Sequence, residues 1–536
     1  MAVPGVLADS AASVVFELWQ RRTRVLARVL SAGVRGVESF PVWVEVNAVN
    51  GLPSFTVVGL PEGAVREGKE RVLAALQNAG CALPPRKVTV NLAPADVRKQ
   101  GSALDLPIAL GLLVVMGHLP QACLDGGLFV GELGLDGALR PMRGAIAVAS
   151  GCEDWGTRRL VVPPENAREA LAACRGVDVI APPCLRTLLR HLEGGEDIPL
   201  PPPTLHSERS DAVPDACFGE VRGQAQAKRA LEIAAAGGHN VLLVGAPGAG
   251  KTMLARRLPG ILPALDLDEA LEVTTIQSVA GCLRSGAGLV RTRPFRAPHH
   301  TISAGGLVGG GSVPRPGEVS LAHRGVLFLD ELPEFRRNSL EALRQPMEDG
   351  EVHIARVRSA VRFPARFLLV AAMNPCPCGH LGDGTDRCLC DPGAVRRYAA
   401  RISGPLMDRI DMCVRVPAVP VGDLIDGVDG EPSARIRTRV ADARAIQRSR
   451  SSDSGGAGVT NAELGPSAIR RHAEITEDIA RMFRQATDRL GLSARALYRV
   501  LRVARTIADI EGDERVGRPH VAEALQYRGG GGVGGG

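Results

Sequence analysis

The chain has 536 residues and a formal net charge of +6, and 45% of its residues are hydrophobic while 23% are charged. These proportions are typical of globular proteins and exclude a disordered, fibrous or membrane-embedded chain. The length predicts two to four domains. Only five of the 64 basic residues are lysines, so the many arginines do not by themselves indicate a nucleic-acid-binding protein.

Residues 106–124 form a long stretch without Asp, Glu, Lys or Arg in the N-terminal half of the chain. Pro107 and Pro120 interrupt it. We therefore expect a buried helix there and no membrane span. No Lys or Arg precedes Arg21, which is the wrong charge order for a signal peptide. Eight of the twelve cysteines are scattered, as in a reducing compartment, so a cytoplasmic protein is expected.

Strand and helix patterns alternate through the first part of the chain. Apolar and polar residues alternate around Val42 to Val46, and the Asn50–Gly51 turn precedes another strand pattern at 55–58, which predicts a hairpin between these two strands. A helix pattern and a strand pattern at 87–92 follow. A first α/β domain is therefore predicted.

Composition changes divide the rest of the chain. A proline-rich stretch follows the first α/β domain, and a Gly-, Asp- and Ser-rich stretch with an arginine-rich middle follows the second. The predicted parts are an N-terminal extension (1–23), the first α/β domain (24–195), a linker (196–218), a second α/β domain (219–420), a flexible basic linker (421–460), a helical domain (461–528) and a glycine tail (529–536).

A phosphate-binding loop begins the second domain. The short apolar strand 241–244 leads directly into a glycine-rich loop and a helix-compatible segment, which is the context that this motif requires. Lys251 is expected to reach the β- and γ-phosphates of ATP, and the Thr252 hydroxyl to bind Mg²⁺. The predicted nucleotide-binding residues are Gly245, Ala246, Pro247, Gly248, Ala249, Gly250, Lys251 and Thr252.

Two later strands are predicted to end beside this loop. The strand 326–329 runs into Asp330, which is suited to hold the magnesium ion, and Glu331, which is suited to polarise the attacking water. The strand 367–373 delivers Asn374, whose amide can position the same water. Further on, Arg409 stands between two aspartates. It forms either a local ion pair or an arginine finger that reaches the γ-phosphate in a neighbouring subunit.

These motifs resemble those of an AAA+ ATPase of the helix-2-insert branch, and more closely the magnesium-chelatase-like YifB/ComM family. The resemblance covers roughly residues 25–525 and is most continuous at 294–331 and 372–379. It implies an α/β fold with an AAA+ P-loop NTPase core and a helical lid, preceded by a Lon-protease-like α/β domain. The roles that it implies are sensor 1 for Asn374, trans-acting finger for Arg409 with Arg401 as a second candidate, and sensor 2 for Arg495.

Four cysteines crowd together after Asn374, namely Cys376, Cys378, Cys388 and Cys390. Zn²⁺ prefers four soft ligands in a tetrahedron, and the glycines between the two pairs allow the loop to fold back on itself. The sequence therefore predicts a structural zinc site, with His380 as a spare ligand. The alternative is a set of unpaired thiols in a loop.

Peptidase activity is disfavoured in the first domain. Lon-type chemistry needs a serine activated by a lysine amine, but Ser102 is displaced from the nucleophile position, and no lysine follows Glu132 until Lys228. Ser102 is therefore expected to be a turn or capping residue. The basic residues Lys87, Arg98 and Lys99 either bind nucleic acid or a partner, or form a solvated face.

The segment 351–363 alternates apolar and polar residues around a short turn and predicts a hairpin. By the resemblance, this hairpin points into the pore of a ring, where Arg356 and Arg358 contact DNA phosphates. An ordinary surface hairpin is the alternative. The arginine-rich helix predicted at 435–450 is a further candidate for the DNA surface.

The leading hypothesis is an ATP-hydrolysing motor that assembles into a homo-oligomeric ring, expected to be a hexamer, and translocates DNA. The resemblance implies branch migration during natural transformation, with DNA contacts that do not depend on base sequence. The alternatives are the motor subunit of a magnesium chelatase and a nucleotide-switched assembly factor that binds DNA or protein without moving along it.

Overall fold

The computed structural model describes residues 26–81, 85–99, 101–195, 197–199, 216–311, 313–356, 359–384, 386–419, 422, 430–452 and 460–529. The chain forms two compact units, one of residues 1–206 with 270–290, and one of residues 207–269 with 291–536. The predicted extension 1–23 lies outside the described residues, as do most of the proline-rich linker and residues 530–536 of the glycine tail.

The segment 270–290 belongs to the first unit although it lies within the predicted second domain. Ser278, on helix α9 (Leu267–Ala280), accepts a hydrogen bond from the Gly144 backbone N–H at 3.0 Å. The Gly286 backbone N–H donates to the Glu165 carbonyl at 3.1 Å. The domain boundaries predicted from composition do not separate residues 270–290 from the second domain, because no change of composition marks this segment.

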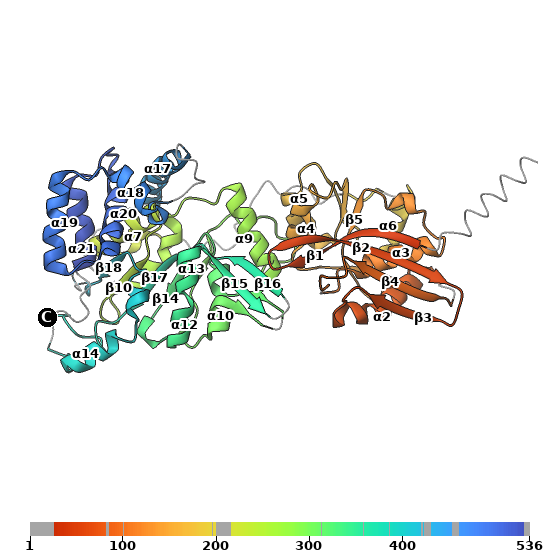
Figure 1. Cartoon of the computed structure of the whole chain (residues 1–536), viewed down its shortest axis with the longest axis horizontal. Helices are drawn as coiled ribbons and strands as arrows, with labels where there is room; N and C mark the ends of the chain where they lie inside the picture. The colour runs from red at the N-terminus through yellow and green to blue at the C-terminus, as the bar shows by residue number, and fades with distance from the viewer. Residues whose placement is uncertain are drawn as a thin grey trace, which may run out of the picture. The chain divides into compact units, whose positions relative to one another are not determined.

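A seven-stranded mixed sheet forms the centre of the first unit (Figure 1). The strands β1 and β2 make a long antiparallel hairpin, and the alternate residues Val42, Val44 and Val46 of β2 are fully buried. In spatial order the strands are β3 (Ser54–Val58), β4 (Lys87–Ala93), β2 (Glu38–Val49), β1 (Leu26–Arg35), β5 (Gly127–Phe129), β8 (Arg159–Val161) and β9 (Asp178–Ile180).

The predicted hairpin between Val42 and Val58 is wrong. Strand β4 lies between β2 and β3, because it pairs antiparallel with β2 and parallel with β3. The turn at Asn50–Gly51 reverses the chain but does not decide which strands pair. The buried helix expected at 106–124 is confirmed for its first half as α3 (Asp105–Val115), in which every residue is buried, whereas the second half contains a turn and a short 3₁₀ helix (Gln121–Cys123).

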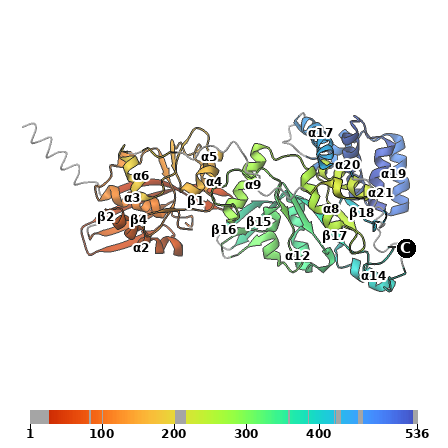
Figure 2. The same ribbon diagram turned by 180° about the vertical axis from the view of Figure 1, so that it is seen from behind.

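Helices and two very short strands complete the first unit. Helix α3 packs against both α2 and the β1–β2 hairpin, and Figure 2 shows α3 and α6 from the other side. These remaining elements are α2 (Gly63–Asn78), β6 (Glu132–Leu133), β7 (Leu139–Arg140), α4 (Ala145–Gly151), α5 (Ala167–Ala173) and α6 (Leu185–Leu192). The α/β class expected for this part of the chain is confirmed.

A five-stranded parallel sheet forms the centre of the second unit. Every residue of its three middle strands is buried, as expected for uninterrupted apolar runs in a parallel sheet covered on both faces. In spatial order the strands are β11 (Phe295–Arg296), β14 (Val326–Leu329), β17 (Leu368–Met373), β10 (Val241–Val244) and β18 (Met412–Arg415).

Short helices and two hairpins surround this sheet. The predicted hairpin at 351–363 forms, with β15 (Glu351–Arg356) antiparallel to β16 (Ser359–Pro364), and a smaller one joins β12 (Gly309–Gly310) to β13 (Arg315–Pro316). The helices are α7 (Ala225–Gly237), α8 (Lys251–Arg257), α10 (Ala304–Val308), α11 (Glu318–Leu321), α12 (Arg337–Ala342), α13 (Arg344–Asp349), α14 (Pro392–Ala399) and α15 (Gly404–Met407).

A bundle of helices follows the sheet in the chain, and its helices α19, α20 and α21 lie side by side (Figures 1 and 2). Its helices are α17 (Ser433–Ser452), α18 (Pro466–Ala473), α19 (Glu477–Leu490), α20 (Ala494–Glu511) and α21 (Arg518–Gly529). Helix α17, with 20 residues, occupies half of the 40-residue range predicted as a flexible basic linker and contains the arginine-rich helix predicted at 435–450. Within the described residues, no helix is both long and apolar enough to cross a membrane.

Candidate functional site

The phosphate-binding loop lies at the carboxyl ends of the parallel strands. Residues 245–250 connect β10 to α8, and Gly248 and Gly250 adopt φ values of +77° and +90° that other residues rarely adopt. The Thr252 hydroxyl, on the first turn of α8, donates to the Asp330 carboxylate at 2.7 Å. A hydroxyl and a carboxylate so placed are both oxygen ligands of the kind that Mg²⁺ takes beside a nucleotide.

The Lys251 side chain contacts both the phosphate-binding loop and Asn374, the residue that follows strand β17. Its ammonium group donates to the carbonyls of Gly245 and Ala246 at 2.7 and 3.0 Å, and to the Asn374 side-chain oxygen at 3.2 Å. Burial lowers the pKa of this amine, whereas Asp330 and Glu331 act in the opposite direction. A phosphate would exchange these weak neutral acceptors for strongly anionic ones.

Glu331 has a neighbour that sequence reasoning missed. The imidazole Nδ1 of His300 lies 3.3 Å from the Glu331 carboxylate, and the His300 ring contacts the rings of His299 and Phe335. Residue 300 follows β11, the strand next to β14, so the two side chains come from adjacent strand ends. Glu331 itself has a φ of +52°, which is strained for a residue with a side chain.

The two arginines predicted to act on phosphate meet at one carboxylate. Glu348, on α13, forms an ion pair with Arg409 and another with Arg495, the latter at 3.4 Å. The hydrogen bond from Arg409 lowers the pKa of Glu348. The Arg409 side chain is only 11% exposed, and its Nε has no hydrogen-bond partner among the described residues. Glu348 therefore provides the countercharge for a largely buried arginine.

The second finger candidate, Arg401, is in a different setting. Its guanidinium pairs with Glu334 at 2.7 Å and lies 5.9 Å from the centre of the Tyr398 ring. The Arg401 side chain is 52% exposed, so it is more accessible to another molecule than Arg409 is. Each of these arginines has its own acidic partner, Glu334 for Arg401 and Glu348 for Arg409. Among the described residues, neither forms a hydrogen bond with the phosphate-binding loop.

The four cysteines of the predicted zinc site come together. All four sulfur atoms lie within 4.8 Å of one another, and the Cys376–Cys378, Cys376–Cys388 and Cys378–Cys388 distances are 3.3, 3.8 and 3.7 Å. A Zn²⁺ ion with Zn–S bonds of about 2.3 Å in a tetrahedron requires sulfur separations of about 3.8 Å. The spare ligand His380 instead pairs with Asp383 at 3.0 Å.

One thiol of the cluster is set apart from two others. Hydrogen bonds from the His380 backbone N–H and from Cys376 lower the pKa of Cys378 to about 6. A backbone hydrogen bond acts in the same direction on Cys388 and Cys390, but burial and the neighbouring sulfurs raise the pKa of both, that of Cys390 to about 11. Because four thiolates cannot share this small volume without a countercharge, a metal ion is what would keep all four deprotonated.

A second group of possible ligands, in the helical bundle, does not suit a metal. His520 lies 3.0 Å from Glu511 and 3.2 Å from Asp513 through its Nε2 atom. The Gly517 backbone N–H donates to the other ring nitrogen, Nδ1. The proton of the neutral imidazole therefore lies on Nε2, where it is donated to the carboxylates and blocks the lone pair that a metal would need.

Ser102 and Lys99 are each engaged with other groups and do not form a serine–lysine pair. The Ser102 hydroxyl donates to Glu132, and the Lys99 side chain is buried with its ammonium group on the Pro94 carbonyl. Asp105 is also buried and pairs with Arg71 at 2.7 Å, and burial raises the pKa of this carboxyl to about 6. Lys99 is therefore not on the solvated basic face suggested by the sequence, whereas Lys87 is exposed.

The predicted DNA-contacting arginines differ in what the structure shows of them. Arg356 ends β15, its side chain is not described, and Arg358 lies outside the described residues. On α17, three of the six arginines form contacts with other parts of the protein that stabilise the fold. Arg439 pairs with Glu232 and Glu431, Arg444 donates to the Ala235 carbonyl, and Arg450 pairs with Asp509.

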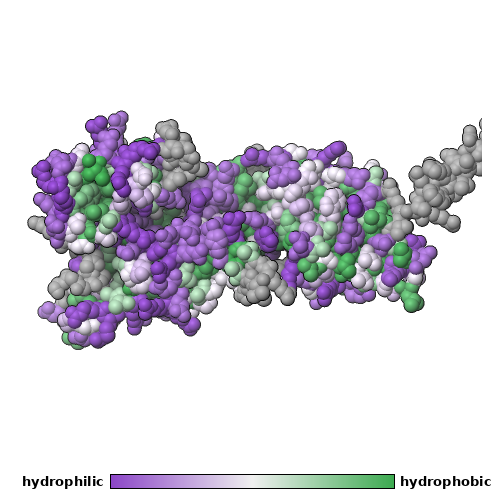
Figure 3. Space-filling view, in the orientation of Figure 1, coloured by the Kyte–Doolittle hydropathy of each residue, from purple (hydrophilic) through white to green (hydrophobic). Residues whose placement is uncertain are grey.

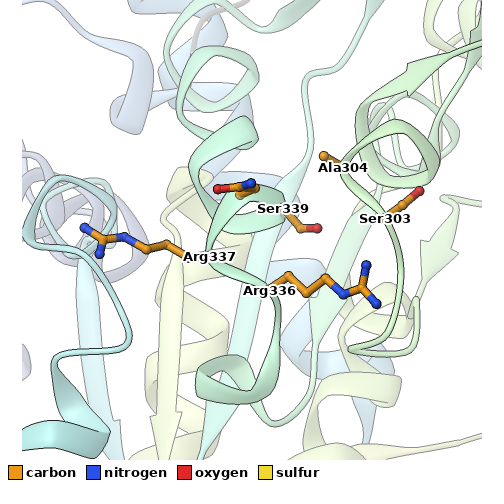
Figure 4. A pocket seen from close by; sticks show the side chains of 6 residues that line it. Ser303, Ala304, Arg336, Arg337 and Ser339 are labelled. Atoms are coloured by element: carbon orange, nitrogen blue, oxygen red, sulfur yellow. The ribbon is translucent and has the colours of Figure 1, made fainter.

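A cavity of about 520 Å³ lies between α10 and α12, lined by Ser303, Ala304, Arg336, Arg337, Asn338 and Ser339 (Figure 4). Arg336 and Arg337 extend in opposite directions in Figure 4. Their charges therefore do not converge on one ligand position, and the cavity is distinct from the phosphate-binding loop. The candidate nucleotide-binding site is therefore the phosphate-binding loop with Asp330 and Asn374, which follow the neighbouring strands.

Three protein families match the chain. They are described as magnesium chelatase, subunit ChlI, over residues 217–424; subunit ChlI of Mg-chelatase, over 44–166; and magnesium chelatase, subunit ChlI C-terminal, over 430–528. Together with the parallel sheet and its phosphate-binding loop, these matches define a magnesium-chelatase-like AAA+ ATPase with an α/β core.

Full-length relatives narrow this class. The chain is 44% identical over 504 residues to the uncharacterized protein YifB of Salmonella typhimurium, and 44% identical over 506 residues to the competence protein ComM of Haemophilus influenzae; each match covers 94% of this chain and 97% of the relative. The magnesium-chelatase 38 kDa subunit of Acidiphilium rubrum is 25% identical over 358 residues, which is 58% of this chain and 90% of that subunit. The chain belongs to the YifB/ComM family.

Proposed function

We propose that this protein hydrolyses ATP with Mg²⁺ and uses the cycle to translocate DNA as a homo-oligomeric ring, expected to be a hexamer. The observation that carries the ATPase is the convergence of Lys251, Thr252, Asp330 and Asn374 at one edge of the parallel sheet. The similarity to a protein named competence protein ComM supports a role in the uptake or recombination of DNA. Branch migration during natural transformation is the specific activity proposed.

The surface of the ATPase unit suits contacts with a polar, charged partner. Hydrophilic residues cover most of the face that Figure 3 shows of this unit. Arg435 and Arg437 are exposed on α17, and Arg356 is the last residue of β15. Aromatic residues make up only 3% of the chain, so contacts with the phosphate backbone are favoured over stacking on bases.

DNA is expected to stimulate ATP hydrolysis, and the stimulation should weaken as salt is raised. Three phosphate contacts predict a loss of about 40-fold in affinity for double-stranded DNA, and about 20-fold for single-stranded DNA, between 50 and 200 mM salt, because counterions compete for the phosphates. The measurement is steady-state phosphate release with branched, single-stranded, double-stranded and no DNA at each salt concentration. A chelatase motor subunit should not respond to any of these DNAs, and an assembly factor should respond without displacing a strand.

Arg409→Ala is expected to inactivate hydrolysis only through neighbouring subunits. An arginine that stabilises the transition state from the next subunit contributes about 10³-fold in turnover. When Arg409→Ala protein is mixed with Lys251→Ala protein, a ring can contain interfaces with one intact loop facing one intact arginine, so activity should reappear. Activity that stays absent at every mixing ratio, with assembly shown by light scattering, would contradict a trans-acting role.

We also propose that the four-cysteine cluster binds a structural zinc ion. The sulfur separations, which match those of a tetrahedral Zn²⁺ site, support the proposal. Metal analysis of reduced, carefully purified protein should give about one zinc per chain, and well under one would contradict the proposal.

A further inference from the structure

The loop that carries the four cysteines begins inside the proposed nucleotide site. Asn374, which accepts a hydrogen bond from Lys251 at 3.2 Å, stands two residues before Cys376. Cys376 is fully buried, so the first sulfur of the cluster is fixed close to the end of strand β17. Any displacement of this sulfur is therefore transmitted through two peptide units to the residue that touches the loop lysine.

The cysteine loop contacts the phosphate-binding loop at a second point. Gly379 is buried with a φ of +86°, and a β-carbon added to it would lie 2.6 Å from the Cδ atom of Pro247. The Gly379 backbone is thus packed directly against the middle of the phosphate-binding loop. Two independent contacts, one polar and one steric, join the cysteine loop to the nucleotide site.

The loop has no apolar core of its own, and the ion pairs of Asp383 with His380 and Arg387 lie within it. Its described part between Asn374 and α14 contains no helix or strand. Leu381 and Leu389 are 44% and 92% exposed, so they do not form a hydrophobic core for it. A segment without its own apolar core depends on a cross-link, and four thiolates around one metal ion supply such a cross-link.

We infer that metal occupancy of the cysteine cluster and nucleotide affinity of the phosphate-binding loop are coupled in this chain. The ligand of the cluster is a soft divalent cation, zinc, and its binding fixes the backbone that carries Asn374 and supports Pro247. The inference rests on the proposed nucleotide site and on the proposed zinc ion. Coupling is reciprocal, so bound nucleotide must also strengthen metal binding by the same factor.

The first experiment compares the full chain with and without metal. Zinc is removed with a chelator under reducing conditions, the chelator is removed by gel filtration, and binding of a fluorescent, non-hydrolysable ATP analogue is measured with Mg²⁺. We expect stripped protein to bind the analogue about tenfold more weakly, and restored zinc to reverse this loss. Zinc release to a chromogenic chelator should be slowed by the analogue. Cys388→Ser should behave like stripped protein, and Cys282→Ser, which changes an exposed cysteine outside the cluster, like wild type.

A matched pair of glycine variants tests the contact without touching a cysteine. Gly379→Ala should retain a full zinc content but bind the analogue more weakly, because its new methyl group collides with Pro247. Gly382→Ala is the control: Gly382 also has a positive φ, +73°, but no atom lies within 4 Å of the added carbon. Both variants carry comparable backbone strain, so a difference between them reports the contact itself.

The outcomes separate this inference from the proposals on which it rests. Equal nucleotide affinity in zinc-loaded and stripped protein, or in the two glycine variants, would overturn the coupling while leaving the ATPase proposal intact. Zinc-loaded wild type that fails to bind the analogue would instead overturn the proposed nucleotide site. A zinc content near zero in folded wild-type protein would overturn the metal assignment.

Discussion

Lys251→Ala is expected to weaken binding of ATP and Mg²⁺ by at least about 100-fold and to abolish hydrolysis. The ammonium group donates to three neutral acceptors, the carbonyls of Gly245 and Ala246 and the Asn374 amide oxygen, which a phosphate would replace. Losing one charge-assisted contact to a phosphate costs about 3 kcal/mol, which is about 100-fold in affinity. Isothermal calorimetry with a non-hydrolysable analogue measures this loss directly.

Lys228→Ala is the matched control for that variant. The Lys228 ammonium also donates to a backbone carbonyl, that of Val221, and burial likewise lowers the pKa of its amine. Its removal should leave nucleotide affinity unchanged. The nucleotide-dependent rise in melting temperature should persist in Lys228→Ala and vanish in Lys251→Ala, because only a ligand that binds the folded state stabilises it. Equal affinities in the two variants would contradict the assignment of Lys251.

Most of the nucleotide site could be predicted from local patterns. Each of its parts follows a short apolar strand: Asp330 and Asn374 come directly after β14 and β17, and Lys251 and Thr252 come after β10 and the glycine-rich loop 245–250. In a parallel sheet all these strands end at one edge, so knowing the strands is enough to bring the side chains together. The four cysteines were predictable for a similar reason, since they lie within 15 residues.

Contacts between distant segments could not be predicted in this way. Glu348 is 61 residues from Arg409 and 147 from Arg495, and no spacing rule relates them. The contact of His300 with Glu331 depends on β11 being the neighbour of β14, which is a property of the sheet order. The predicted hairpin near Asn50 failed for the same reason, because β4 arrives from elsewhere in the chain to separate the two strands.

Charge patterns are also ambiguous without a fold. The arginines of α17 look alike in the sequence, but Arg439, Arg444 and Arg450 are engaged with α7 and with Asp509, whereas Arg435 and Arg437 are exposed. An arginine that satisfies a buried carboxylate or carbonyl cannot also neutralise a DNA phosphate without loss of stability. The structure therefore reduces the candidate DNA surface of this helix to its exposed arginines.

Glu331→Gln is expected to keep nucleotide affinity and to lower turnover by about 10²- to 10⁴-fold, the usual range for losing a general base. Glu331 follows Asp330 but does not share its contact with Thr252, since its carboxylate is 57% exposed and faces His300. Removing its charge should therefore leave the magnesium ligands in place. Single-turnover hydrolysis and analogue binding, measured on the same preparation, separate the chemical step from affinity.

Asp330→Asn supplies the contrast, because the Asp330 carboxylate accepts the hydrogen bond from the Thr252 hydroxyl at 2.7 Å. This variant should lose affinity for the Mg²⁺ complex, and raising the Mg²⁺ concentration should recover part of it. The Glu331→Gln defect should not respond to Mg²⁺ at all. If both variants lose affinity in parallel, or if Glu331→Gln hydrolyses ATP normally, the two neighbouring acids do not divide their roles between metal and water, and the base must be sought elsewhere at the strand ends.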